Sequence, residues 1–410
     1  MKTEIITIGD EILSGHIQNL NAQWLANHLT ENGFDVRRIT TLPDNTQTVI
    51  DCFQMATERS ELVFVTGGLG PTNDDITHQA ISEFFKVRWK FNERVYERLK
   101  EFLLERGYTM SHHSKQNAKV PENAQIFINH EGTAPGLMLQ TNNVPFIFVP
   151  GVHVEMKKMA EESIIPQLKK VYLKNSLINE VIVVQGITEA HLAKKLKYWE
   201  KNLPSEFSLA YLPGPALVKL RITGRGSNHQ ILRDIAEAKI AELYDIIPEH
   251  YVARGNVTLE EVVGNMLAVK GETLSTAESC TGGAISAAIV SVPGSSDYYK
   301  GSVVAYSNQI KHSVLSVSED IIKRYGAVSR EVTEAMAKNV RELFKTDYAI
   351  AVSGIAGPSG GTYEKPVGTT WITVVRDSHI ESKMFLFGKN RATNIQKTKN
   401  TSLNMLRKIM

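Results

Sequence analysis

The sequence predicts an α/β protein made of three domains. Strand-like apolar runs alternate with helical patterns in the first third of the 410-residue chain, shorter strands follow one another in the middle, and a strand runs into a helix again in the last third. The chain is also longer than a single ordinary core. We expect a parallel-sheet domain over 1–170, a small α+β module over 171–252 and an α/β domain over 253–410.

The composition is typical of a soluble globular protein. Hydrophobic residues make up 42% and charged residues 22%, and no apolar run approaches the roughly 20 residues that span a bilayer. The chain enters a strand-like run at Ile5, which leaves no room for a signal peptide and favours a cytoplasmic location without membrane contact. Cys52 and Cys280 are too few for a disulfide framework or a thiolate zinc site. A net charge of +2 does not indicate nucleic-acid binding through a strong basic field.

The first third alternates strand and helix. We expect strands at 5–8, 36–40 and 61–66, and a helix over 19–32 that stops at Gly33. This order favours a mostly parallel sheet whose ligands bind at the carboxyl ends of the strands.

A glycine-rich loop follows the third of these strands. Its glycines would let backbone N–H groups approach a phosphate, and the aspartates that follow could hold a divalent cation against it. It is not a Walker A loop, because no Gly-Lys-Ser/Thr follows. The alternative is a plain turn in which Asp74 caps a helix that starts near Ile76. The candidate phosphate ligands are Gly67, Gly68, Gly70 and Thr72, and the candidate metal ligands are Asp74 and Asp75.

The middle segment predicts a small α+β module. Its expected elements are a strand at 180–184, a helix over 188–199, strands at 208–212 and 218–223, and a helix over 230–243. No Gly-x-x-Gly loop of the kind that clamps a nucleic-acid backbone is present. We expect the lysines of the first helix to be solvated, direct nucleic-acid binding to be absent, and the module to connect the other two domains.

The last third begins with a capping box, Thr258 with Glu261, ahead of a helical apolar pattern. A strand at 273–277 then leads into Ala-Glu-Ser-Cys-Thr-Gly-Gly, 277–283, and a helix over 284–290. Hydroxyls, a thiol and N–H groups thus meet at a helix start, where the dipole favours negative charge. The segment is either a capped helix with glycines for close packing, or a turn that presents a phosphate cradle, an oxyanion site or a nucleophile.

Candidate partners for Ser279 lie on two further predicted strands. Tyr306 is on the strand at 301–308 with Lys311 shortly after it, and Ser353 is on the strand at 348–358. Serine, lysine and tyrosine are the parts of a hydrolase that uses a neutral lysine as its base. Each residue also has a plainer interpretation. Tyr306 could be a β-former, Lys311 a solvated helix residue and Ser353 a turn former. Cys280 competes as nucleophile, since a helix N-terminus can lower a thiol pKa, or it is a small buried residue.

These motifs together resemble the CinA family over essentially the whole chain. The front carries Gly9–Leu13 and the Thr66–Asp75 loop, together with Lys115-Gln116, 132–136 and Pro150-Gly151, and resembles a molybdopterin-binding-type domain. The middle, with 211–215, resembles the family's KH-related module. The segments 277–283, 292–296, 304–308 with Lys311, and 353–358 resemble its C-terminal domain. One departure is His153, which replaces the second proline of the usual Pro-Gly-Val-Pro.

For the C-terminal domain the resemblance implies nicotinamide mononucleotide deamidase activity without a cofactor. Ser279, Tyr306 and Lys311 match the active-site positions. Ser279 is expected to attack the carboxamide, with Lys311 as base, Tyr306 assisting proton delivery to ammonia, and the N–H groups of 281–283 stabilising the oxyanion or holding the 5′-phosphate. The commoner Gly-Asp-Arg form is replaced here by Gly-Lys-Asn-Arg, which ends at Arg391. The candidate substrate-binding residues are Cys280, Thr281, Gly282, Gly283, Ser353, Gly354 and Arg391.

For the front domain the resemblance implies metal-dependent ADP-ribose pyrophosphatase activity. Asp10 and Glu11 join the candidate metal ligands, and Gly132, Thr133 and Pro135 join the candidate substrate-binding residues. The partners expected are therefore the two nucleotides, a divalent metal ion and a second copy of the chain in a homodimer. Two other classes of function stay open, which are a nucleic-acid-linked competence or DNA-damage accessory protein and a non-catalytic pterin-binding protein.

Overall fold

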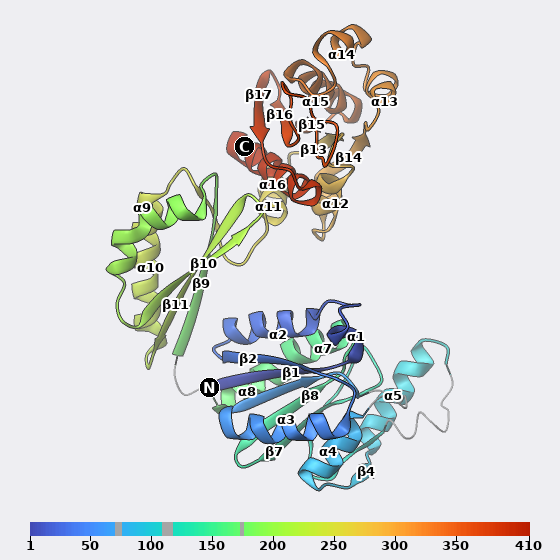
Figure 1. Cartoon of the computed structure of the whole chain (residues 1–410), viewed down its shortest axis with the longest axis vertical. Helices are drawn as coiled ribbons and strands as arrows, with labels where there is room; N and C mark the ends of the chain where they lie inside the picture. The colour runs from blue at the N-terminus through green and yellow to red at the C-terminus, as the bar shows by residue number, and fades with distance from the viewer. Residues whose placement is uncertain (70–75, 109–117, 173–175) are drawn as a thin grey trace. The chain divides into compact units, whose positions relative to one another are not determined.

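The structure is a computed structural model that describes residues 1–69, 76–108, 118–172 and 176–410. Contacts divide it into two compact units. The first comprises Met1–Ile178 and Arg225–Arg233, and the second Asn179–Gly224 and Asp234–Met410. The α/β class is confirmed, with a mostly parallel sheet in the front domain, a smaller α+β module, called the KH-like module below after the resemblance stated above, and a C-terminal α/β domain (Figure 1).

A six-stranded sheet of order β2-β1-β3-β8-β7-β6 forms the front domain. The first four strands are parallel, and β7 and β6 are antiparallel to their neighbours. The sheet strands are β1 Lys2–Ile8, β2 Asp35–Leu42, β3 Leu62–Thr66, β6 Gln125–Phe127, β7 Gly136–Thr141 and β8 Val144–Val149. A separate pair comprises β4 Trp89–Phe91 and β5 Lys119–Pro121. The helices are α1 Asp10–Leu13, α2 Leu20–Glu31, α3 Thr46–Arg59, α4 Thr77–Phe85, α5 Glu93–Glu105, α7 His153–Met159, a π-helical turn Ala160–Ile164, and α8 Ile165–Tyr172.

Both faces of this sheet are buried, because alternate strand residues enter two different cores. Phe146 and Phe148 pack with Phe53 of α3, whereas Ile147 and Val149 belong to the core that α2 and α7 cover. In Figure 1, α2, α7 and α8 lie on one face of the sheet and α3 and α4 on the other. The carboxyl ends of β1, β3 and β8 are left open at one edge.

The KH-like module has a four-stranded sheet of order β10-β11-β9-β12 with antiparallel pairs at both ends. Its elements are β9 Ser176–Gln185, α9 Glu189–Lys201, β10 Phe207–Gly214, β11 Leu217–Gly226, α10 His229–Ile246 and β12 Tyr251–Arg254. Leu192, Leu196 and Trp199 form the buried side of α9. The lysines lie on its other side, which agrees with a solvated face.

The C-terminal domain has a five-stranded sheet of order β14-β13-β15-β16-β17. The strands are β13 Leu274–Glu278, β14 Tyr299–Val304, β15 Tyr348–Gly354, β16 Thr369–Arg376 and β17 His379–Leu386. The helices are α11 Leu259–Lys270, α12 Ala284–Val290, a 3₁₀ turn Ser295–Asp297, α13 Asn308–Ser313, α14 Glu319–Tyr325, α15 Arg330–Phe344 and α16 Arg391–Ile409. Because β13 runs parallel to β14 and β15, their carboxyl ends meet at one edge. The residues that follow β13 and β14 therefore lie close together.

Two hydrophobic cores cover the two faces of the five-stranded sheet in the C-terminal domain. Residues of α11, α12 and α16 pack on one face, and residues of α15 pack on the other. In the described part of the chain, no helix is both long enough and apolar enough to cross a membrane.

Candidate active site

The nucleophile candidate Ser279 follows β13 directly. Its N–H donates to the carbonyl of Val352 at 3.1 Å, so the backbone of Ser279 continues the pairing with β15. The chain then turns into α12 through Gly282 and Gly283, whose φ angles of 62° and 101° lie in the left-handed region that favours glycine. The glycines of this motif therefore permit the turn.

Lys311 on α13 reaches Ser279 from the neighbouring strand end. Its Nζ lies 2.9 Å from Ser279 Oγ and 2.7 Å from the carbonyl oxygen of Ala305, and the Lys311 residue is only 1% exposed. No acidic side chain of the described residues pairs with this amine. Burial therefore lowers the pKa of Lys311 below its ordinary value.

The neutral form of Lys311 suits these contacts. A neutral amine has two N–H groups and one lone pair. The carbonyls of Ala305 and Tyr306, at 2.7 and 3.5 Å, can accept the two N–H groups, which leaves the lone pair for the hydroxyl of Ser279. In the structure Lys311 Nζ donates to Ser279 Oγ. In the neutral state the direction of this hydrogen bond would reverse, as a base-activated nucleophile requires.

The expected use of the N–H groups of 281–283 needs correction. The Glu278 carboxylate accepts the N–H groups of Gly283, Ile285 and Ser286, at 3.1, 3.0 and 2.7 Å. The N–H of Gly282 donates to the carbonyl of Ser279 at 3.1 Å. Because a carboxylate from the same chain already occupies the first turn of α12, Gly282 and Gly283 do not offer free donors for a phosphate or an oxyanion.

Polar groups without a partner remain just before Gly282 in the turn. Within the described residues, the N–H of Thr281 donates to no backbone carbonyl, and its buried Oγ has no hydrogen-bond partner. Thr281 lies two residues after Ser279 in the chain. The sequence predicted a role for all N–H groups of 281–283. It gave no sign that the Glu278 carboxylate accepts the N–H group of Gly283, whereas the polar groups of Thr281 remain available.

Cys280 lies beside the nucleophile but is a poor thiolate. Burial raises the pKa of its thiol to about 12, so the expected effect of the helix N-terminus on this pKa does not prevail. Gly354, at the end of β15, packs against it, and an added Cβ there would lie 3.1 Å from Cys280 Sγ. Cys280 thus fills space between two strand ends.

The other predicted residues of this domain are only partly brought together. The hydroxyl of Tyr306 accepts a hydrogen bond from Arg391 Nη2 at 3.1 Å, and Arg391 Nη1 donates to the carbonyl of Gly357 at 3.0 Å. Tyr306 approaches Lys311 through its backbone carbonyl, and its side chain is exposed. Ser353 is buried and donates to the carbonyl of Ala327 at 2.7 Å.

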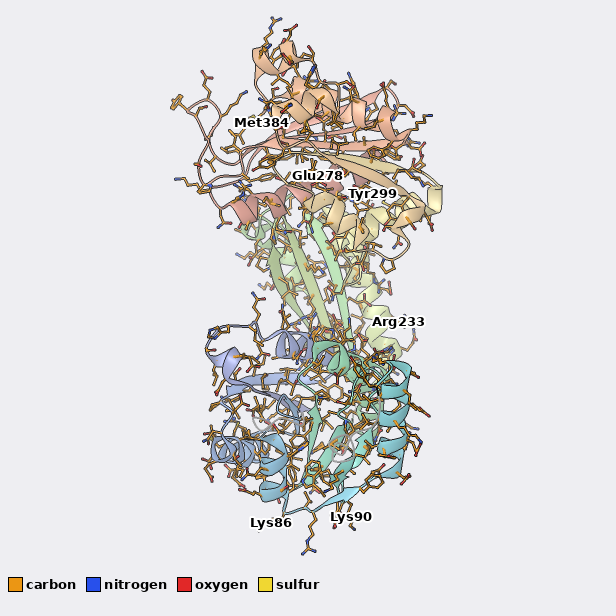
Figure 2. All side chains as sticks on the ribbon, turned by 90° about the vertical axis from the view of Figure 1, so that its right-hand side faces the viewer. Lys86, Lys90, Arg233, Glu278, Tyr299 and Met384 are labelled. Carbon is orange, nitrogen blue, oxygen red and sulfur yellow. The ribbon has the colours of Figure 1, made fainter. Side chains whose placement is uncertain are left out.

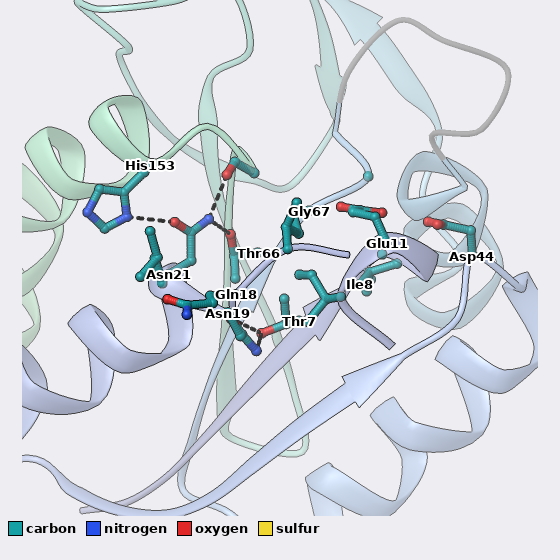
Figure 3. A pocket seen from close by; sticks show the side chains of 16 residues that line it. Thr7, Ile8, Glu11, Gln18, Asn19, Asn21, Asp44, Thr66, Gly67 and His153 are labelled. Carbon is teal, nitrogen blue, oxygen red and sulfur yellow. Dashed lines mark hydrogen bonds between the residues drawn. The ribbon is translucent and has the colours of Figure 1, made fainter. Parts of the chain in front are cut away.

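A separate cavity of about 440 Å³ lies in the front domain, over the carboxyl ends of β1, β3 and β8 (Figure 3). Gly67 and Gly68 line it, as expected for the glycine-rich loop. A Cβ on Gly67 would lie 2.2 Å from the carbonyl oxygen of Ile8, so this position needs glycine for close backbone packing. Gly70, Thr72, Asp74 and Asp75 lie outside the described residues, as do Lys115 and Gln116.

One wall of this cavity is an amide network that the sequence did not reveal. Asn21 Nδ2 donates to the carbonyl of Gly151 at 2.6 Å and to Thr66 Oγ1 at 3.1 Å. The carbonyl contact fixes the orientation of the amide, so Asn21 Oδ1 accepts from Nδ1 of His153 at 2.8 Å (Figure 3). The histidine that replaces the usual proline thus helps to hold the cavity wall.

Acidic side chains line the opposite part of the cavity. Glu11 is there as expected, together with Asp44, which accepts from the N–H of Asp10 at 2.9 Å. Carboxylate oxygens are the ligands that hard divalent cations prefer, so the donor chemistry fits a metal ion. Among residues 1–69, 76–108, 118–172 and 176–410, however, no three acidic, histidine or cysteine side chains form a metal-binding group.

Gly132, Thr133 and Pro135 do not line this cavity. They border a small pocket with Val95 and Leu99 instead. Gly132 packs so closely against Glu155 that an added Cβ would lie 2.1 Å from its carboxyl group. Among the described residues, these three therefore do not share a cavity with Gly67 and Gly68.

Three family models match successive parts of the chain. They are the probable molybdopterin binding domain over 4–170, the damage-inducible protein CinA KH domain over 179–253 and the CinA C-terminal domain over 256–410. A CinA-like protein from Cytophaga hutchinsonii is 39% identical over 99% of this chain and 97% of its own length. A CinA-like protein from Flavobacterium psychrophilum is 38% identical over 100% of this chain and 98% of its own. A putative competence-damage inducible protein from Caldicellulosiruptor saccharolyticus is 37% identical, over 100% and 99%. With three domain models in this order and relatives matched over their full length, the chain belongs to the CinA family.

Proposed function

We propose that the C-terminal domain hydrolyses the carboxamide of nicotinamide mononucleotide to give nicotinate mononucleotide and ammonia. One observation carries the proposal, namely the buried Lys311 amine 2.9 Å from Ser279 Oγ with no acidic partner in the described structure. A lysine held in this way loses its proton more easily than an exposed one. It is therefore suited to take the proton of the serine hydroxyl.

In the first half of the reaction, Ser279 Oγ bonds to the carboxamide carbon while its proton passes to Lys311 Nζ. The carbonyl becomes an oxyanion, which the N–H and the hydroxyl of Thr281 are suited to stabilise. The carbon–nitrogen bond then breaks. The nitrogen takes the proton from Lys311, with Tyr306 assisting, and leaves as ammonia, so that an ester on Ser279 remains.

Water completes the reaction. Lys311 accepts a proton from a water molecule while the oxygen of that water bonds to the ester carbon. The bond between this carbon and Ser279 Oγ then breaks, and the proton returns from Lys311 to the serine oxygen. The exposed guanidinium of Arg391, beside Tyr306, is suited to bind the 5′-phosphate. This takes the place of the phosphate role first expected for 281–283.

The test compares two neighbouring substitutions. Purified wild-type chain is incubated with nicotinamide mononucleotide and the ammonia released is measured. Ser279→Ala should abolish release, whereas Cys280→Ala should retain it, because the thiol is buried and protonated. Full activity in Ser279→Ala, or its loss in Cys280→Ala alone, would reject serine as the nucleophile.

We further propose that the front domain cleaves the pyrophosphate of ADP-ribose. The cavity supports this, since glycine backbone at Gly67 and Gly68 and carboxylates at Glu11 and Asp44 line the same space. A divalent cation bound there would polarise the pyrophosphate and activate water. Glu11 and Asp44 are the described residues that would hold it, and Asn21 would keep the cavity wall in place.

This second proposal has its own test. Formation of AMP from ADP-ribose should require added divalent metal, stop with a chelator and fall in Glu11→Gln. A chain that forms no AMP with any metal and retains a pterin chromophore after purification would instead be a pterin-binding protein. A salt-dependent gel shift at sub-micromolar protein would favour the nucleic-acid-linked function.

A further inference from the structure

Glu278 is a buried carboxylate with an unusual set of partners. It is the last residue of β13, it is 0% exposed, and Figure 2 labels it within the C-terminal domain. Its oxygens accept three backbone N–H groups, from Gly283, Ile285 and Ser286. No lysine, arginine or histidine pairs with it in the described part of the chain.

Backbone N–H groups replace the missing cation. A buried carboxylate is strongly destabilising unless hydrogen bonds compensate for the loss of water. Three hydrogen bonds of 2.7–3.1 Å at the positive end of α12 supply that compensation. The carboxylate thereby fills the position where a helix start would otherwise bind an anionic group of a ligand.

These contacts fix the five residues that separate Glu278 from α12. The side chain joins the end of β13 to the first turn of α12, so that 279–283 form a closed turn. The N–H of Ser279 is held separately by Val352, at 3.1 Å. Ser279 is thus fixed by its own backbone on one side and by the closed turn on the other, with Lys311 Nζ 2.9 Å away.

We propose that Glu278 is a positioning residue of the deamidase site, whose carboxylate clamps the turn that carries Ser279 and the unpartnered hydroxyl of Thr281. This inference rests on the proposed function. It also means that the 5′-phosphate of the nucleotide binds outside the first turn of α12, because the clamp occupies that position.

The test uses two variants and a matched control. Glu278→Ala removes the clamp, and Glu278→Gln keeps its shape but turns an amide N–H toward the N–H groups of α12. Glu272→Gln is the control, because Glu272 precedes the same strand and accepts hydrogen bonds from Tyr348 and Arg376 at 2.9 and 2.7 Å, far from the turn. Circular dichroism and thermal melting establish that each variant is folded.

The first measurement is the rate at which a fluorophosphonate labels Ser279, which does not depend on the substrate. We expect labelling to fall about 100-fold in Glu278→Ala and about 10-fold in Glu278→Gln, because a small displacement of the nucleophile is enough to lose such factors. Glu272→Gln should label at the wild-type rate. With nicotinamide mononucleotide, kcat should fall similarly while KM changes little.

Chemical rescue separates the clamp from a general loss of structure. Acetate matches the atoms that Glu278→Ala removes, so added acetate should restore labelling several-fold, whereas neutral acetamide of the same shape should not. Wild-type labelling in folded Glu278→Ala and Glu278→Gln would overturn the proposal. So would equal loss in Glu272→Gln, or acetamide rescue equal to that of acetate.

If the wild-type chain does not deamidate nicotinamide mononucleotide, the proposed substrate fails, but the labelling and rescue still decide the role of Glu278.

Discussion

Lys311 is the residue on which the account of the C-terminal site depends. An exposed lysine is protonated at neutral pH and cannot act as a base. Here burial lowers the pKa of the amine, and the carbonyls of Ala305 and Tyr306 can take its N–H groups when it is neutral. The proposed mechanism therefore relies on desolvation of Lys311 for its base, without the carboxylate that orients the histidine of a Ser-His-Asp triad.

The pH dependence of the reaction follows from this pKa. Because the neutral amine is the active form, kcat/KM should rise with pH through a pKa that lies below the ordinary lysine value of 10.5. Lys311→Arg should lose about 100-fold or more at every pH measured, since a guanidinium does not deprotonate. A pH–rate profile of both proteins checks this. An unchanged profile in Lys311→Arg would contradict the role of the base.

Several residues of the sites could not be predicted from residue type. Ser279 and Lys311 are chemically distinctive and lie at predicted strand ends, so the sequence was sufficient to pair them. Glu278 was read as part of a motif, because a glutamate at a strand end gives no sign that it folds back onto backbone N–H groups. Asn21 was missed for a related reason, since its partners, Thr66 at the end of β3 and Gly151 after β8, are distant in sequence.

At the scale of elements, the site depends on the close approach of the ends of β13 and β15. Gly354→Ala would place a Cβ 2.7 Å from Thr370 Oγ1, 2.9 Å from the carbonyl oxygen of Thr369 and 3.1 Å from Cys280 Sγ. We expect it to lower the free energy of unfolding by about 1–3 kcal/mol through overpacking, and to lower kcat by displacing the turn.

The matched control is Gly271→Ala, at the C-terminal end of α11. Its φ of 65° strains alanine, but nothing lies within 4 Å of the added Cβ. It should lose about 1 kcal/mol of stability and keep its kcat. Denaturant unfolding and ammonia release measure both effects. Equal losses of kcat in the two variants would mean that kcat follows stability and not the position of the turn.

Elements with a regular apolar pattern were predicted well, and others were not. The structure confirms the capping box of Thr258 and Glu261 and the helix Ala284–Val290. The helix α16 was not predicted, because its buried side includes Asn394, Thr398 and Asn400, which hide the apolar periodicity. The strands β16 and β17 were also not predicted.

At the scale of the whole molecule, each proposed site is built within one unit. The cavity with Glu11 and Asp44 belongs to the first unit, whereas Ser279, Lys311 and Glu278 belong to the second. The described parts of the two sites share no residue. The two activities should therefore be separable by substitution.

A double dissociation tests this separation. A chelator should stop AMP formation from ADP-ribose and Glu11→Gln should lower it, and both should leave ammonia release within about twofold of wild type, because the proposed Ser279–Lys311 mechanism involves no metal. Lys311→Arg should have the opposite effect, with the loss expected for removal of a general base. The two products are measured in parallel from the same preparations. A chelator that stops ammonia release would contradict a deamidase without a metal.

The most direct test of the Ser279–Lys311 mechanism is to trap its covalent intermediate. The wild-type chain is mixed with nicotinamide mononucleotide, quenched in acid within one turnover and digested for mass spectrometry. The account predicts that the peptide containing Ser279 gains the mass of the substrate less ammonia, with the ester on the serine oxygen. Ammonia release without any adduct, or an adduct carried by Cys280, would contradict it.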